Sequence, residues 1–251
     1  MADKSFKTID EQLEILRSRG LTITDEAKAK DFLLHNNYYR ISGYSLTLRK
    51  NDIFFNSATF QNIIDIYNFD HELRHIILQY IEVIEVLIKS VYAYEFTKVH
   101  GATGYLNSAF FTDEQKHKEI MDKADQQKTQ RLPHEAYLKH FVNDLKQEIP
   151  LWAFVDLFTI SDISFLYSIS EQPIKEAVAN TVGLTMKKGT TILGSYMHSM
   201  TIIRNLCAHG SRIYNRLFEQ KPSLNKKEKA LLITNKDGTV DNAHFYGFIL
   251  I

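Results

Sequence analysis

The stretch that decides the fold runs from Ala58 to His100 and reads ATFQNIIDIYNFDHELRHIILQYIEVIEVLIKSVYAYEFTKVH. Its apolar residues recur at steps of three, four and five, close to the 3.6-residue period of an α-helix. Those expected to share the apolar face are Leu73, Ile76, Ile77, Tyr80, Ile84, Leu87, Val91 and Phe96. Gly101 follows at once, and glycine is the usual residue after a helix end. The stretch therefore predicts one long helix at the core of the protein.

The other boundary signals are mostly those of helices. Thr8 and Glu11 have the spacing of a capping box, and Thr112–Gln115 has the same pattern. Pro173 and Gly183 begin and end a later helix, since proline suits the first turn and glycine the residue beyond the last. A further helix is expected over residues 135–148, and a short extended piece at 53–55. Together these signals predict an all-α fold.

Composition gives the chain no overall charge. Lysine plus arginine number 30, as do aspartate plus glutamate, so no net field draws the whole molecule to a polyanion. The even spread of apolar residues over 251 positions favours one domain. The sequence has no N-terminal apolar signal and no stretch long enough to cross a bilayer, so we expect a cytoplasmic protein without membrane contact. The single cysteine, Cys207, fits a reducing compartment and is expected to be a packing residue.

Positive charge is concentrated near the C-terminal end. Between positions 204 and 229 the only acidic residues are Glu219 and Glu228, against the cations Arg204, Arg212, Arg216, Lys221, Lys226, Lys227 and Lys229. Such a local excess could bind phosphates, and it could equally be a solvated tail.

The run Ile203–Gly210 (IRNLCAHG) lies at the start of this basic segment and carries candidate catalytic groups. In a helix, Asn205 and His209 are four residues apart and share a face, and the long side chain of Arg204 can reach the same side. Gly210 is expected to end the helix, which places His209 in its last turn, where the helix dipole favours an imidazolium. Imidazole is also the side chain best suited to proton transfer near neutrality. Dipole complementarity alone could nevertheless place an arginine and a histidine here.

Glu85 on the long predicted helix is a candidate supporting residue. With Glu82 and Lys89 it has the spacing of a solvated, salt-bridged stripe. The alternative is that Glu85 faces the helix of Arg204 and His209 and orients one of their cations.

Four blocks in order carry a resemblance to a known family. They are Tyr38–Tyr44 (YYRISGY), Ile66–Arg74 (IYNFDHELR) with Ile84–Val86 (IEV), Ile149–Trp152 (IPLW), and Arg204–Arg216 (RNLCAHGSRIYNR). Together they resemble the Abi-like (AbiD/AbiF-type, Abi_2) abortive infection proteins of bacteria, which belong to the HEPN superfamily of helical ribonucleases. The resemblance implies a HEPN-like helical bundle with additional N-terminal and inserted helices. The expected segments are a helical extension over 1–56, the HEPN-like domain over 57–220 and a basic C-terminal segment over 221–251.

The resemblance also implies an activity. It implies a metal-independent endoribonuclease that acts as a toxin or effector of phage defence. Arg204, Asn205 and His209 from two copies would form one site. At this site the 2′-hydroxyl of the RNA would attack the adjacent phosphate. Arg212, Tyr214, Arg216 and Arg40 are candidates for RNA binding; Tyr214 could stack a base or equally pack in the core, whereas the tyrosines of Tyr38–Tyr44 more often pack. The sequence shows no phosphate-binding glycine loop and no clustered metal ligands, so we expect no cofactor and no metal. The expected partners are RNA, a second copy, and an inhibitory RNA or protein antitoxin.

A different class of function remains open at this point. The same arginine and histidine would also serve a non-catalytic helical RNA-binding or signalling module of a defence or toxin–antitoxin system. A structural dimer whose interface is the motif helix is a third interpretation.

Overall fold

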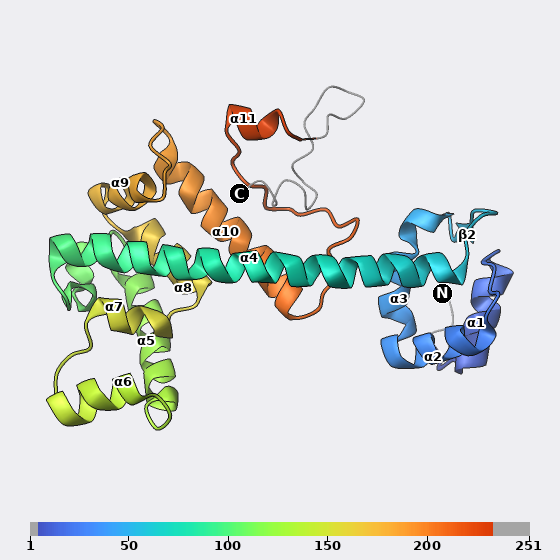
Figure 1. The fold of residues 1–251 in the computed structure, drawn as a ribbon, viewed down its shortest axis with the longest axis horizontal. Coiled ribbons are helices and arrows are strands. Elements are labelled where there is room, and N and C mark those ends of the chain that lie inside the picture. The colour runs from blue at the N-terminus through green and yellow to red at the C-terminus, as the bar shows by residue number, and fades with distance from the viewer. Residues whose placement is uncertain (1–4, 233–251) are drawn as a thin grey trace. The chain divides into compact units, whose positions relative to one another are not determined.

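The computed structural model describes residues 5–232, and helices dominate it (Figure 1). The α-helices are α1 (Ile9–Ser18), α2 (Glu26–Asn36), α3 (Tyr38–Tyr44), α4 (Phe60–His100), α5 (Glu114–Arg131), α6 (Ala136–Lys139), α7 (Leu151–Phe154), α8 (Ile160–Ile169), α9 (Gln172–Thr181), α10 (Gly189–Ala208) and α11 (Lys226–Lys229). The strands β1 (Arg49–Lys50) and β2 (Ile53–Phe54) pair antiparallel, as the expected extended piece at 53–55 suggested. The predicted all-α fold is confirmed. None of the described helices is long and apolar enough to cross a membrane.

The chain divides into two compact units, each with its own core. The first contains residues 5–77 and 206–217, and the second contains residues 78–205 and 218–232. The sequence suggested one domain, with boundaries at residues 56 and 220. In the structure residues 206–217 belong to the N-terminal unit, where their backbone is hydrogen-bonded. The part of the expected basic segment at 233–251 lies outside the described residues.

The first unit packs α1, α2 and α3 with the beginning of α4. Its core includes the fully buried Leu13, Leu33, Tyr44 and Ile63. The predicted capping box of α1 is present, since the Thr8 hydroxyl accepts from the Glu11 N–H and the Glu11 carboxylate accepts from the Thr8 N–H. Both interactions satisfy donors that a helix N-terminus leaves without partners.

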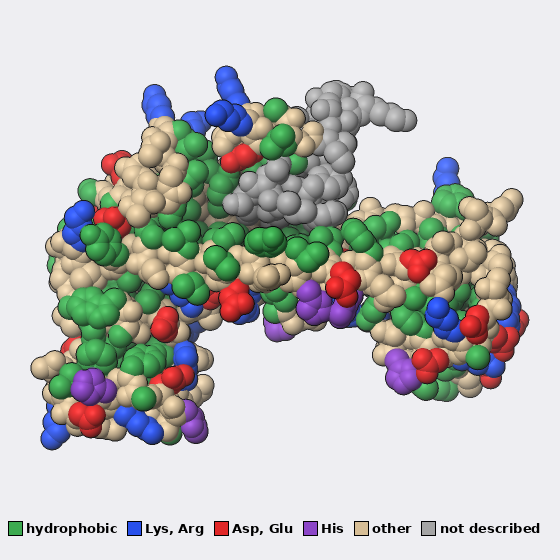
Figure 2. All heavy atoms as spheres, in the orientation of Figure 1, with side chains coloured by type: hydrophobic (Ala, Val, Ile, Leu, Met, Phe, Trp, Pro, Cys, Tyr) green, Lys and Arg blue, Asp and Glu red, His purple; other side chains and the backbone are tan. Residues whose placement is uncertain are grey.

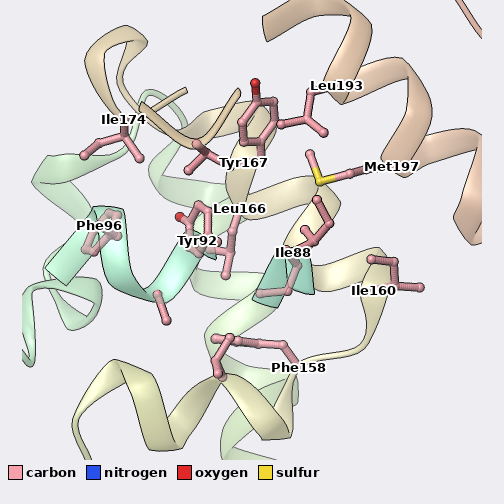
Figure 3. Packing of buried hydrophobic residues seen from close by; sticks show 14 of the residues in the cluster. Ile88, Tyr92, Phe96, Phe158, Ile160, Leu166, Tyr167, Ile174, Leu193 and Met197 are labelled. Atoms are coloured by element: carbon pink, nitrogen blue, oxygen red, sulfur yellow. The ribbon is translucent and has the colours of Figure 1, made fainter. Parts of the chain in front are cut away.

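The second unit packs the later part of α4 against α8, α9 and α10. Figure 3 shows Tyr92 and Phe96 of α4 with Leu166 of α8 and Met197 of α10 in this core. The Phe96 ring also stacks on the Phe111 ring, with centroids 5.3 Å apart. Pro150 precedes α7 and Pro173 lies in the first turn of α9, as expected of proline near helix starts.

The apolar face predicted for α4 is wrong in part. The expected core residues Ile76, Tyr80 and Leu87 are exposed to 52, 66 and 49%. In the second unit the helix instead buries Ile81 and Ile88, which lie on another face. Exposed apolar residues, which Figure 2 shows along α4, extend the unburied face: Tyr80, Val83, Val86, Leu87 and Tyr94. Because α4 is apolar on more than one face, a 3.6-residue period could not tell which face packs.

Two smaller expectations are also corrected. The N-cap of α5 is Asp113, whose carboxylate accepts from the Lys116 N–H, while Thr112 instead donates to the Ile169 carbonyl. The helix expected over 135–148 is the short α6, followed by a π-helical segment, His140–Leu145, and it ends where Lys146 takes a left-handed conformation. The left-handed residue cannot continue a right-handed helix.

Candidate functional site

The helix α10 carries Arg204 and Asn205. It ends one residue earlier than the sequence predicts, and Gly210 follows its end as expected. Its last helical residue is Ala208, and Gly210 has a φ of +63°. The Gly210 N–H donates to the Cys207 carbonyl at 3.0 Å, and the Ser211 N–H donates to the Leu206 carbonyl at 2.8 Å. These bonds satisfy two carbonyls that the helix end leaves without partners. His209 therefore lies just past the helix and is exposed, rather than inside the last turn.

Arg204 lies beside Glu85, both in the second unit. The Arg204 Nε is 3.9 Å from Glu85 Oε2, and the Glu85 Oε1 is 2.9 Å from the Nζ of Lys89. Since the Glu85 and Lys89 side chains are only 17 and 14% exposed, this part of α4 is not the solvated stripe considered from the sequence. At 3.9 Å the contact with Arg204 is a charge interaction rather than a hydrogen bond. The Arg204 side chain is 42% exposed, so it can still contact a ligand.

Asn205 completes the group in the second unit. Its side-chain Oδ1 accepts a long hydrogen bond of 3.4 Å from the Arg204 guanidinium, and the residue is exposed. The structure therefore brings Glu85, Arg204 and Asn205 together, with an amide and a guanidinium accessible. His209 belongs to the first unit, four residues further along the chain.

Arg40 is one of the residues predicted to bind RNA, and it has intramolecular partners. Its guanidinium donates to the Gly210 carbonyl at 2.6 Å and to the Tyr67 hydroxyl at 3.4 Å. It also lies 5.4 Å from the centroid of the Tyr67 ring, within cation–π range. Arg40 thus fixes the glycine that follows His209, which is a positioning role.

The structure contains a buried polar cluster centred on Asp70 that the sequence did not predict. The Tyr44 hydroxyl donates to Asp70 Oδ2 at 2.7 Å, and the Arg74 guanidinium donates to the same oxygen. The backbone N–H groups of Ile213 and Tyr214 donate to Asp70 Oδ1 at 3.1 and 2.6 Å. Asp70 thereby joins α3, α4 and the segment after the motif.

The burial of this cluster makes its hydrogen bonds necessary. Asp70 is 0% and Arg74 is 3% exposed, and a buried charge is tolerated only when it is paired and hydrogen-bonded. Burial, together with donation to Asp70, raises the pKa of Tyr44 to about 12, so its hydroxyl stays protonated. The signal available in the sequence was the Asp–Arg pair at a spacing of four within the block Ile66–Arg74, which contributed to the family resemblance without indicating a role.

The segment after the motif is also held by its own side chains. The Arg212 guanidinium donates to the Tyr214 carbonyl, and to the Asn215 carbonyl at 3.2 Å. The Tyr214 hydroxyl is 3.2 Å from the Thr47 hydroxyl. A side chain at Gly43 would come within 3.1 Å of the Arg212 Nε. Of the residues predicted to bind RNA, Arg212 and Tyr214 are thus engaged inside the first unit.

Two further residues bear on the chemistry. Arg216 is exposed, which leaves it accessible to a phosphate. Cys207 is buried, and burial raises the pKa of its thiol to about 11, so it is not a thiolate near neutrality. The interpretation of Cys207 as a packing residue agrees with this burial. Among the described residues no group of three or more His, Cys, Asp or Glu side chains is arranged to hold a metal ion.

Comparison with known proteins gives one match. A family model described as Abi-like protein matches residues 31–215. The matched range contains the Asp70 cluster, Glu85 and the run from Arg204 to His209. Neither the curated proteins nor the solved structures include a match.

Proposed function

Because the chain belongs to the Abi-like protein family, which supports a role related to abortive infection, we propose that it is a metal-independent endoribonuclease of the HEPN type. The observation that carries the proposal is the accessible Arg204 guanidinium held beside the half-buried Glu85 at the end of α10. A fixed guanidinium is the group that binds the oxygens of a phosphate in a planar, two-pronged manner.

His209 supplies the proton transfer in this proposal. The RNA 2′-hydroxyl attacks the adjacent phosphorus as its proton leaves, and the 5′-oxygen departs as it gains a proton. The products are a 2′,3′-cyclic phosphate and a 5′-hydroxyl. A positioned imidazole contributes on the order of 10²–10⁴ in rate to such a step. Arg204 stabilises the charge on the non-bridging oxygens, Asn205 orients His209 or donates to the phosphate, and Glu85 positions Arg204.

The reaction calls for two copies of the motif. One imidazole is badly placed to act as base and acid on opposite sides of the same phosphorus, whereas two imidazoles can divide these roles. A symmetric homodimer presents the same residues twice. In an uninfected cell such an enzyme must be kept inactive, and we propose that an RNA or protein antitoxin does this.

The test is cleavage of labelled RNA by the purified full chain in excess EDTA. We expect cleavage that persists under chelation, 2′,3′-cyclic phosphate ends, and loss of cleavage in His209→Ala and Arg204→Ala. His35→Ala is the matched control, because His35 is an exposed histidine on α2. Cleavage that survives His209→Ala, or no cleavage of any cellular RNA, would contradict the proposal.

Two measurements separate the alternatives. Binding of RNA without cleavage, weakened by Arg204→Ala, would indicate a non-catalytic RNA-binding module. A structural role predicts instead that Arg204→Ala lowers the stability of a dimer and leaves RNA binding and cleavage unchanged, which sedimentation and thermal unfolding would show. The enzyme proposal requires the reverse pattern, with normal assembly and lost cleavage.

A further inference from the structure

A cavity of about 360 Å³ lies in the second unit, and Glu85, Arg204 and Asn205 are not among the residues that line it. Side chains from α5, α8, α9 and α10 line it. Its volume is within the range of small-molecule binding sites, which is roughly 300–1,000 Å³. A cavity of this size holds more than a single ion.

The lining of the cavity is positively charged. Lys116 and Lys175 contribute ammonium groups and His198 an imidazole, and no aspartate or glutamate is among the lining residues. Within the described part of the chain, neither Lys116 nor Lys175 forms an ion pair, although other lysines do. The cavity therefore attracts an anion that the protein itself does not supply.

Residues at two helix N-termini are among those that line the cavity. Gln172 is the first residue of α9, and Thr190 and Thr191 lie in the first turn of α10. The first N–H groups of a helix lack acceptors within the helix, and the dipole places partial positive charge there. Helix N-termini of this kind commonly bind phosphate groups.

Lys175 is partly shielded from solvent. The residue is half-buried, and burial lowers the pKa of its amine because the ammonium loses solvation. The Tyr167 hydroxyl lies 3.1 Å from the Thr190 carbonyl oxygen and 3.3 Å from that of Lys175, which ties α8 to α9 and to α10. The frame around the lysine is thus formed before any ligand binds.

An aromatic ring borders the cationic part of the cavity. Phe165 is 37% exposed, and the Lys116 Nζ lies 4.8 Å from the centroid of its ring. A ring with an accessible surface beside a cation suits a ligand that has both an anionic group and a flat or apolar part.

We propose that this cavity binds a small phosphorylated ligand of nucleotide size, with its phosphate at Lys116 and Lys175 and its base or sugar beside Phe165. The proposal concerns binding by the second unit and does not depend on RNA cleavage. Direct binding measurements on the full chain therefore test it whether or not the protein is a nuclease.

Calorimetric titration with three probes tests the proposal: AMP, inorganic phosphate and a short single-stranded oligoribonucleotide. We expect AMP to bind with one site per chain and more tightly than inorganic phosphate. The double variant Lys116→Gln/Lys175→Gln should weaken AMP binding at least tenfold. The matched control is Lys187→Gln/Lys188→Gln, which removes two exposed lysines of the same unit outside the cavity and should leave the affinity unchanged.

A second variant blocks the space without changing the charge. Thr191 is exposed and lines the cavity, so Thr191→Trp should abolish AMP binding while the thermal unfolding curve stays that of a folded protein. The proposal is overturned if AMP does not bind, if its affinity is the same in the lysine and tryptophan variants, or if inorganic phosphate binds as tightly as AMP. Binding of the oligoribonucleotide through these lysines without binding of AMP would assign the cavity to an RNA path and overturn it as well.

Discussion

Replacing Asp70 by asparagine tests whether the buried cluster stabilises the first unit. The substitution keeps the size of the side chain and removes its charge, so it leaves the Arg74 guanidinium, 3% exposed, without its anionic partner. Breaking a buried ion pair on one side costs about 3–5 kcal/mol. For a chain of this size, such a loss corresponds to a fall in Tm of roughly 10 °C.

The assay is thermal and urea unfolding followed by far-ultraviolet circular dichroism. The control is Asp65→Asn, on the same helix, because Asp65 is exposed and its carboxylate accepts only a surface hydrogen bond from Gln61. Adding Arg74→Met to Asp70→Asn should recover part of the lost stability, since it removes the unpaired charge. If Asp70→Asn unfolds within about 1 kcal/mol of the wild type, the assignment of this cluster as a stabilising anchor is refuted.

Three further predictions concern pH, the motif terminator and the supporting carboxylate. The pKa of Tyr44 is raised to about 12 in the folded protein, so its contribution is present below the unfolded value near 10 and is lost as pH rises toward 12; Tyr44→Phe should flatten the fall in free energy of unfolding over that window. Gly210→Ala should cost about 1–2 kcal/mol in urea unfolding, because φ is +63°. Glu85→Gln should slow RNA cleavage about tenfold or more without lowering the Tm. The control Glu82→Gln changes an exposed residue of the same helix and should leave the rate unchanged. A fall in Tm without a change in rate would contradict the positioning role of Glu85.

Local chemistry was predictable from the sequence, because each signal acts within a few residues. The capping box of Thr8 and Glu11 and the terminator Gly210 depend on spacings of three residues or fewer, and both are found in the structure. The contact between Arg204 and Glu85 was one of two interpretations of the sequence, and the other placed Glu85 in a solvated stripe. Nothing in the pattern alone decided between them, since α4 has polar residues at helical spacing on more than one side.

What the sequence could not give depends on contacts between distant segments. The buried face of α4 was partly misassigned because apolar residues such as Leu87 and Ile88 point in different directions around the helix, and only the neighbouring helices decide which of them packs. The Asp70 cluster joins residues 44, 70 and 213, so no single stretch reveals it. The cationic cavity collects its lining from four helices, and its lysines are unremarkable in sequence.

The hydrogen bonds of Asp70 to residues 213 and 214 end on the main chain, not on side chains. Every residue except proline has a backbone N–H group, so Asp70 can accept these hydrogen bonds whichever side chains residues 213 and 214 carry. Mutational tolerance should therefore be lopsided. Many replacements of Tyr214 would keep the hydrogen bond from its backbone N–H to Asp70, whereas proline would remove it. At Asp70, by contrast, the carboxylate is itself the acceptor and cannot be replaced.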